Sequence, residues 1–185
     1  MHRTYEYCRD DWTERRKRLL LLSALRRPHY RRAFEAGCAF GHLTQSLAQR
    51  CDEVIAADAD EAALAQARAL LAPQVNVYLS TMHVPQVWPL GHFDLIVLGE
   101  FIYHLSRAQI RQLALRAQQS LDPNGEIVAC HSRLTIPGTG LSGDEAHAEL
   151  HTALPLQYAL RHQEADFILE TWSRESPVAL SVCAA

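Results

Sequence analysis

The sequence contains few residues that break secondary structure, and it has no long apolar run. Of its 185 residues, 8 are glycine and 8 are proline, which excludes collagen-like and disordered chains. The five cysteines are widely spaced and form no C-x-x-C pair, so we expect a reducing, cytoplasmic location and no metal site. The apolar runs fall far short of the ~18 residues that a membrane span needs. No membrane span is therefore expected.

Lysine is nearly absent as well, since 17 of the 18 basic residues are arginine. The net charge of −3 argues against a general nucleic-acid binder. Residues 1–34 nevertheless carry ten basic and four acidic side chains, a balance of +6, so the remainder of the chain sums to −9. The basic run at Glu14–Arg18 is consistent with a solvated helix face, or with a surface for phosphates, acidic sugars or anionic lipid.

Apolar periodicity predicts a single α/β domain spanning residues 1–185. Strands that are apolar on both faces alternate with amphipathic helices, which is typical of a doubly wound, mostly parallel, Rossmann-like sheet. We expect parallel strands at 33–36, 53–58, 75–79, 93–98 and 126–131, and helices at 11–25, 41–50, 60–71, 106–120 and 144–153. A turn is expected at 122–125, and an antiparallel edge hairpin from 166–173 and 178–182 completes seven strands.

The most informative stretch runs from Glu35 through Gly37 to Gly41, with Asp58 further on. A glycine turn after the first strand lets a ligand approach the backbone, and an acid about 20 residues later can accept hydrogen bonds from ribose hydroxyls. The spacing lacks the glycines of G-x-G-x-x-G, which admit a pyrophosphate. Glu35 would repel a pyrophosphate and favour a cationic ligand.

These residues resemble the cofactor site of class I S-adenosylmethionine-dependent methyltransferases. The longer runs Trp12–Lys17, Tyr30–Cys38, Phe93–Glu100 and His131–Arg133 are similar to the nodulation protein S-type N-methyltransferases. The resemblance covers about residues 5–172. It implies S-adenosylmethionine as cofactor, S-adenosylhomocysteine as product, and N-methylation of an amine on a small molecule, an amino sugar or an oligosaccharide.

The resemblance also implies positions for the cofactor. Glu35 and Gly37 face its methionine part, Asp58 holds the ribose, and Thr81 or Met82 flanks the adenine. Many members have an Asp near this last position, which Ser80–His83 lacks, so backbone contacts have to serve there. The full set implied for the cofactor is Glu35, Gly37, Cys38, Gly41, Asp58, Ala59, Thr81, Met82 and Glu100, beneath an N-terminal helical lid (residues 1–30) that adds Arg9, Trp12 and Lys17.

Methyl transfer requires alignment of the reactants and a neutral amine, because an ammonium has no lone pair. His131 is the first candidate for a base or substrate-binding group, and the alternative is a histidine that is simply hydrogen-bonded. His147, Glu100 and Tyr103 are further candidates. Glu100 can also serve as a fixed anion for an ammonium or as a helix cap. His147 and His151 share a helix face, with Asp144 one turn earlier as a possible third ligand, but the Glu of an H-E-x-x-H motif is absent and no metal is expected.

Two other functions remain open from the sequence. A nicotinamide-dependent oxidoreductase could use the same kind of sheet, although the missing glycines and Glu35 argue against it. The chain could also be a non-catalytic, cofactor-binding interaction module that presents Arg15, Arg16 and Arg18 to an anionic partner. The sequence gives no indication of the oligomeric state.

Overall fold

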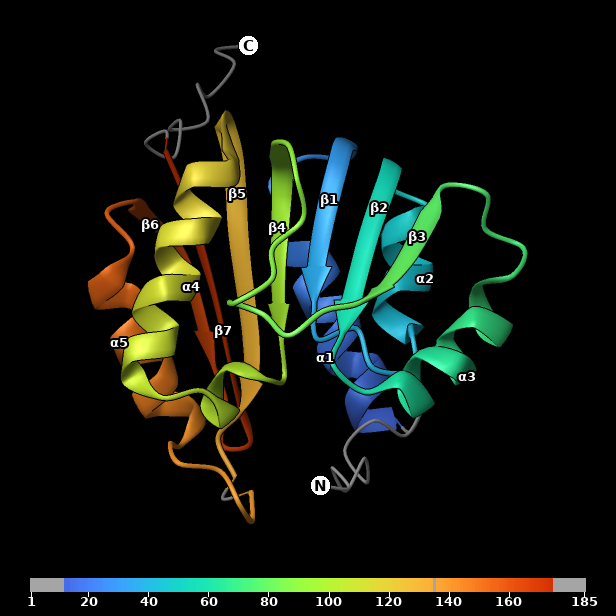
Figure 1. Ribbon diagram of the computed structural model, residues 1–185. Coiled ribbons are helices and arrows are strands. Elements are labelled where there is room, and N and C mark those ends of the chain that lie inside the picture. The colour runs from blue at the N-terminus through green and yellow to red at the C-terminus, as the bar shows by residue number, and fades with distance from the viewer. Residues whose placement is uncertain (1–11, 135, 175–185) are drawn as a thin grey trace, which may run out of the picture.

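A computed structural model describes residues 12–134 and 136–174, which form one seven-stranded sheet of order β3-β2-β1-β4-β5-β7-β6 (Figure 1). Its strands are β1 (Tyr30–Ala36), β2 (Cys51–Asp58), β3 (Val77–Thr81), β4 (Phe93–Gly99), β5 (Leu121–Ser132), β6 (Gln157–Gln163) and β7 (Phe167–Ser173). Strands β1 to β5 are parallel, whereas β7 runs antiparallel to both β5 and β6. The predicted doubly wound, mostly parallel sheet is confirmed.

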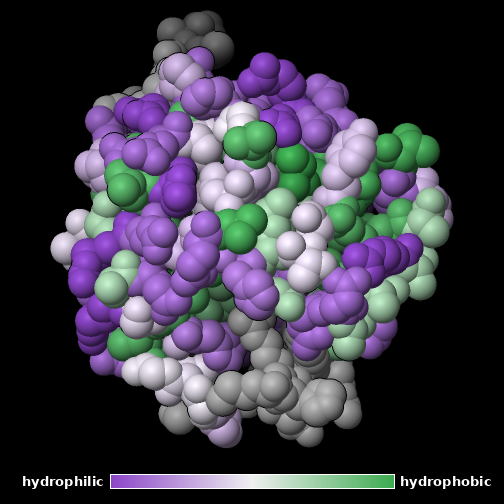
Figure 2. All heavy atoms as spheres, viewed as in Figure 1, coloured by the Kyte–Doolittle hydropathy of each residue, from purple (hydrophilic) through white to green (hydrophobic). Residues whose placement is uncertain are grey.

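Helices cover both faces of this sheet. They are α1 (Trp12–Ala24), α2 (His42–Ala48), α3 (Glu61–Leu71), α4 (Arg107–Ser120) and α5 (Gly143–Ala153), with a 3-10 turn, η2 (Ile102–His104), after β4. In the view of Figure 1, α4 and α5 lie in front of the sheet and α1 and α2 lie behind it. The outer surface over α4 and α5 is mostly hydrophilic (Figure 2).

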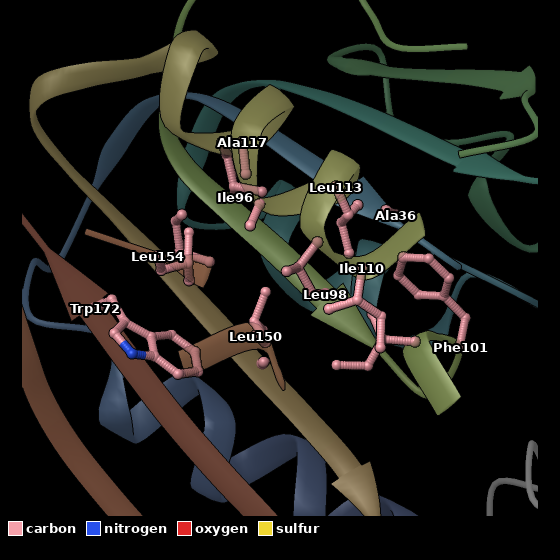
Figure 3. Close-up of a cluster of buried hydrophobic side chains, with 14 of the residues drawn as sticks. Ala36, Ile96, Leu98, Phe101, Ile110, Leu113, Ala117, Leu150, Leu154 and Trp172 are labelled. Atoms are coloured by element: carbon pink, nitrogen blue, oxygen red, sulfur yellow. The ribbon is translucent and has the colours of Figure 1, made fainter. Parts of the chain in front are cut away.

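Alternate residues of each central strand enter two separate hydrophobic cores. In β4, Ile96 and Leu98 belong to the core beneath α4 and α5, whereas Leu95 and Val97 belong to the core beneath α1, α2 and α3. Figure 3 shows Ile110 of α4 directed toward the β4 side chains. This alternation explains why the central strands read as continuous apolar runs in the sequence.

Helices α3 and α4 begin at side-chain caps. Asp60 accepts from the amides of Ala62 and Ala63 before α3, and Ser106 forms a capping box with Gln109 at the start of α4. The helix predicted to begin at Ser106 therefore begins there. None of the helices in residues 12–134 and 136–174 is long and apolar enough to cross a membrane.

The edge hairpin was predicted correctly in kind but with the wrong partner for β7. Both edges of β7 are paired, one with β5 and the other with β6 (Gln157–Gln163), so no edge is left for residues 178–182. Those residues lie outside the described part of the chain. The sequence did not reveal β6 because it is an edge strand with mostly exposed or half-buried side chains, and it therefore lacks the apolar pattern of a buried strand.

The turn predicted at 122–125 is an irregularity inside β5. The pairing with β4 moves from Phe93 opposite Leu121 to Leu95 opposite Glu126, so four residues of β5 lie between these two pairs. Pro123 cannot donate to the ladder, and Gly125 packs closely against the side chain of Leu121. The turn residues thus produce a bulge, and the strand continues on both sides of it.

Candidate functional site

The candidate site lies where β1 and β4 meet, at the carboxyl ends of the parallel strands. Strand order reverses at this point, which is where doubly wound sheets bind ligands. Gly37 follows β1 with a φ of 80°, and its amide and that of Cys38 both donate to the carbonyl of Ala57. A Cβ on Gly37 would lie 2.8 Å from the Gly99 carbonyl oxygen and 2.9 Å from Phe101 Cδ1. Only glycine fits this turn.

Asp58 connects this turn to the end of β2. Its carboxylate accepts from the amide of Ala39 at 3.0 Å and from the amide of Asp60 at 2.9 Å, and the residue is only 3% exposed. Gly41, with a φ of 83°, begins α2, and a Cβ there would lie 2.8 Å from Leu71 Cδ1. The acid and both glycines predicted from the sequence are therefore brought together in one compact turn.

Two cavities meet at Gly37. The first has a volume of about 90 Å³ between α1 and the ends of β1 and β4, and its lining includes Lys17, Glu35, Cys38 and Glu100. The second, about 410 Å³, lies on the β2 and β3 side of Gly37. Its lining includes Asp58, Ala59, Met82, His83, Phe101 and His104.

Glu35 is a buried acid at the end of β1. The residue is 2% exposed, and Thr44 of α2 donates to its Oε2 at 2.6 Å. Burial raises the pKa of Glu35 to about 7, the Thr44 hydrogen bond opposes this shift, and the charge of Asp58 adds to it. A ligand cation beside Glu35 would recover the cost of ionising this carboxyl.

Glu100 is held at the end of β4 in a strained conformation, with a φ of 36°. Its Oε2 accepts from Tyr103 at 2.8 Å and from the Ser132 amide at 3.1 Å, and its Oε1 accepts from Lys17 Nζ at 2.5 Å. Lys17 also donates to Glu14 at 2.8 Å. Burial alone would lower the pKa of Lys17, but the two carboxylates outweigh burial and raise it. Lys17 is therefore a fixed ammonium between α1 and β4.

His131 and His147 lie in the interior and line neither of the two cavities. Both rings are fully or almost fully buried, and His131 Nδ1 lies 3.0 Å from His147 Nε2. The amide of Ile102 donates to His131 Nε2 at 3.3 Å, so both nitrogens of this ring are engaged. Burial, with the neighbouring His147, holds the pKa of His131 well below its usual value. In this arrangement His131 presents no nitrogen to a substrate.

Of the other residues predicted to bind the cofactor, some line a cavity and others are exposed. Met82 and Ala59 line the second cavity, whereas Thr81 is exposed and donates to Glu61. Trp12 is 67% exposed, and Arg9 lies outside the described residues. His104, which the resemblance placed with Glu100 and Tyr103 after the fourth strand, lines the second cavity, whereas sequence reasoning missed the lining side chains His83, Gln86, Phe101 and Gln109. Their only signal is their position just after β3 and β4.

The histidine pair of α5 is engaged with other groups. His147 Nδ1 lies 2.7 Å from Glu170 Oε2, and His151 Nδ1 accepts from Trp172 Nε1 at 3.3 Å. In residues 12–134 and 136–174 there is no group of three or more side chains that could hold a metal ion.

Comparison with known proteins identifies the class. Residues 33–125 match the family model of the methyltransferase domain, which is half of the chain. The chain belongs to this family, as the glycine turn and its two acids predicted. The prediction of a class I S-adenosylmethionine-dependent methyltransferase is thereby confirmed as far as membership of the methyltransferase domain family.

Individual relatives agree with this class. Nodulation protein S of Sinorhizobium fredii is 32% identical over 116 residues, which are 62% of this chain and 53% of the relative. The chain thus spans about half the length of the curated relatives that it matches. A Pseudomonas syringae protein assigned to the methyltransferases is 40% identical, with a TM-score of 0.79 over 89% of this chain and 100% of the other.

The N-methyltransferase NodS of Bradyrhizobium japonicum, solved with S-adenosylhomocysteine, shares the fold. Its TM-score is 0.80, its identity is 23%, and the match covers 92% of both chains.

Proposed function

We propose that this domain transfers a methyl group from S-adenosylmethionine to an amine of a small molecule, an amino sugar or an oligosaccharide. The observation that supports it best is the arrangement of two buried acids, Glu35 and Asp58, on either side of the Gly37 turn. The S-adenosylhomocysteine in NodS and the nodulation protein S relatives support the same choice of cofactor and of amine chemistry. A cytoplasmic location stays a prediction.

The residues present fit such a cofactor. Glu35 is a buried carboxyl whose ionised form gains from an adjacent cation, as a sulfonium or an ammonium would provide. Asp58 lies at the lining of the larger cavity, where its carboxylate can accept from ribose hydroxyls. Met82 and Ala59 contribute apolar surface to the same cavity. The methionine part would then lie in the smaller cavity and the nucleoside in the larger one.

When bound, S-adenosylmethionine supplies a methyl group on a positively charged sulfur and leaves as S-adenosylhomocysteine. An amine nitrogen that accepted this methyl group would take on the positive charge that the sulfur loses. Helix α1 covers the smaller cavity with Lys17 and Leu21 and excludes water. Glu100 provides a fixed negative charge near the developing ammonium.

Lys17 has a second effect in this proposal. Its ammonium lies 2.5 Å from Glu100 and stays charged. Lys17 offsets the charge of Glu100, so an ammonium acceptor gains less from Glu100 than it would from an unpaired carboxylate, and the neutral amine that can attack competes better for the site. Glu100 then orients the acceptor through a hydrogen bond, and Tyr103, which lines neither cavity, holds Glu100 through its hydroxyl. Neither has to remove a proton before the methyl group moves.

The two alternatives have less support. Ala39 stands where a pyrophosphate-binding turn needs glycine, and the buried Glu35 disfavours a dinucleotide. An Arg-rich docking helix is disfavoured because Arg16 binds Glu164 with both guanidinium nitrogens, at 2.7 and 2.6 Å, on the same molecule.

Calorimetric titration with S-adenosylhomocysteine tests the cofactor assignment. We expect saturable binding, and an Asp58→Ala protein should bind about 50-fold more weakly because it loses a charge-assisted contact and the support of the turn. Asp52→Ala is the matched control, since Asp52 is an exposed acid near the start of the same strand that pairs with His29. Wild-type affinity in Asp58→Ala would overturn the ribose assignment.

A panel of amines that includes glucosamine-terminated oligosaccharides tests the acceptor class by release of S-adenosylhomocysteine. Turnover with at least one amine supports N-methylation. Turnover with hydroxyl acceptors alone would contradict it.

A further inference from the structure

A buried network of polar side chains connects the edge hairpin to the end of β4. Tyr158 of β6 donates to Glu170 Oε1 at 2.8 Å, and Glu170 Oε2 contacts His147 Nδ1 at 2.7 Å. His147 Nε2 contacts His131 Nδ1 at 3.0 Å, and His131 Nε2 accepts from the Ile102 amide at 3.3 Å. We call Glu170, His147 and His131 the buried histidine network.

The geometry fixes the protons of the buried histidine network. A backbone amide can only donate, so His131 Nε2 accepts from Ile102 and the proton of this ring is on Nδ1. His147 Nε2 must then accept from His131, so the proton of His147 is on Nδ1, from which it donates to the Glu170 carboxylate. Each donor meets one acceptor, and both rings are neutral. Protonation of either ring would place two donors against each other.

This network lies in apolar surroundings, where polar groups are costly. His131, His147 and Glu170 are 0%, 1% and 3% exposed, within a core that contains Trp172 and Leu150. Buried polar groups are tolerated when every hydrogen bond is made, and a single missing partner then costs more than the pair contributes. Such a network holds its members in one arrangement.

The group held at the end of the network is the η2 turn. Ile102 is its first residue, and Tyr103 is its second. The Tyr103 ring contacts the His131 ring edge to face, with centroids 5.4 Å apart, and its hydroxyl donates to Glu100. The position of Glu100 therefore depends on where the network places η2. None of the three network side chains lines either cavity, so their effect on the site is indirect.

We propose that Glu170, His147 and His131 are positioning residues of the transfer reaction, which hold η2 so that Tyr103 keeps Glu100 facing the methyl acceptor. They do not touch the substrate. His131 thereby acts through the backbone of Ile102, and it is not the base that its place at a strand end suggests. The proposal rests on the proposed function for its effect on turnover, and on the geometry alone for its effect on η2.

Amide hydrogen exchange, read by NMR, tests the positioning directly. In His147→Leu and His131→Leu, the Ile102 amide should exchange at least tenfold faster, while the Val97 amide in the middle of β4 changes less than twofold. His131→Gln restores an acceptor for Ile102 and should bring its exchange back within threefold of wild type. Tyr158→Phe keeps the contacts of both histidines and is the matched control, with less than a twofold change.

Steady-state kinetics test the link to the reaction. For an amine that the wild type methylates, His147→Leu should lower kcat at least tenfold while KM for S-adenosylmethionine changes by a smaller factor, because His104 is the one η2 residue that lines the larger cavity. Unchanged Ile102 exchange, equal acceleration at Ile102 and Val97, or unchanged kcat would each overturn the proposal. If the wild type methylates no amine, the proposed function fails, and the exchange data still decide whether the network positions η2.

Discussion

The two halves of the site are built in different ways. The cofactor half consists of short contiguous segments, residues 35–41 and 58–60, in which backbone amides and glycines supply most of the contacts. The acceptor half consists of side chains far apart in the sequence. Lys17 reaches Glu100 across 83 positions, and His147 reaches Glu170 across 23. The cofactor half is therefore a local structure at the ends of the paired strands β1 and β2, whereas the acceptor half depends on the correct docking of α1, β4, η2, β5, α5 and β7.

The largest effect is expected at the Gly37 turn, where the cofactor half has no space for a side chain. Gly37→Ala combines a positive φ with a 2.8 Å contact to backbone, so we expect a loss of about 3 kcal/mol in the free energy of unfolding and more than 100-fold in S-adenosylhomocysteine affinity. Gly138→Ala is the control, because its φ is also positive and nothing lies within 4 Å. It should cost about 1 kcal/mol, with unchanged affinity. Equal losses in both variants would contradict the packing argument.

An intermediate effect is expected at Lys17, where the acceptor half meets the lid. Lys17→Met removes the cation between Glu14 and Glu100, so kcat should fall about tenfold, while S-adenosylhomocysteine binding falls less. The same variant should shift the rise of the rate with pH to higher pH, since a protonated amine then binds well and must lose its proton. Arg15→Met, an exposed change on the same helix, is the control. An unshifted pH profile would contradict the role given to Lys17.

A smaller effect, dependent on pH, is expected at Glu35. The pKa of Glu35, about 7, falls when a cation binds. The affinity for S-adenosylmethionine should therefore increase by up to tenfold for each unit of increasing pH until pH 7, and level off at higher pH. Stability changes in the opposite sense. The raised pKa stabilises the ligand-free protein fully below about pH 4.5, and this contribution is lost as the pH rises through 7.

The Glu35→Gln variant isolates this effect. The affinity of Glu35→Gln should be weaker and nearly independent of pH between 5.5 and 8. The difference between the urea midpoints of wild type and variant should vary with pH over the same window. Parallel pH profiles for the two proteins would show that Glu35 does not face the cation.

The smallest effect is expected at the ion pair that joins α1 to the β6–β7 turn. Arg16 and Glu164 are partly exposed, with side chains 41% and 26% accessible, and salt and water screen such pairs. Arg16→Ala should shift Tm by no more than about 2 °C and S-adenosylhomocysteine affinity by less than threefold. A loss as large as that of Lys17→Met would mean that the lid is held from the edge hairpin and not from the site.

The sequence alone determined the turn on which the proposed cofactor half is built. Gly37, Gly41 and Asp58 are close in a turn whose geometry follows from strand, glycine and helix in succession, and local spacing is enough to place them. The positions of the parallel strands along the chain follow from periodicity, and the cap at Ser106 follows from local hydrogen bonding. The turn predicted at 122–125 is not a chain reversal, but the same residues do interrupt the regular pairing of β5 with β4.

Only the tertiary structure decided the acceptor half and the sheet edge. No spacing rule predicts that Lys17 contacts Glu100. Nor does one predict that the rings of His147 and His131 connect Glu170 to the Ile102 amide. These contacts form only when α1 and α5 pack on the sheet that contains β5 and β7. The strand β6 escaped notice for a related reason, since its register comes from β7 and not from its own apolar pattern. Local sequence fixes backbone geometry over a few residues, whereas the protonation and orientation of a buried side chain depend on every element that surrounds it.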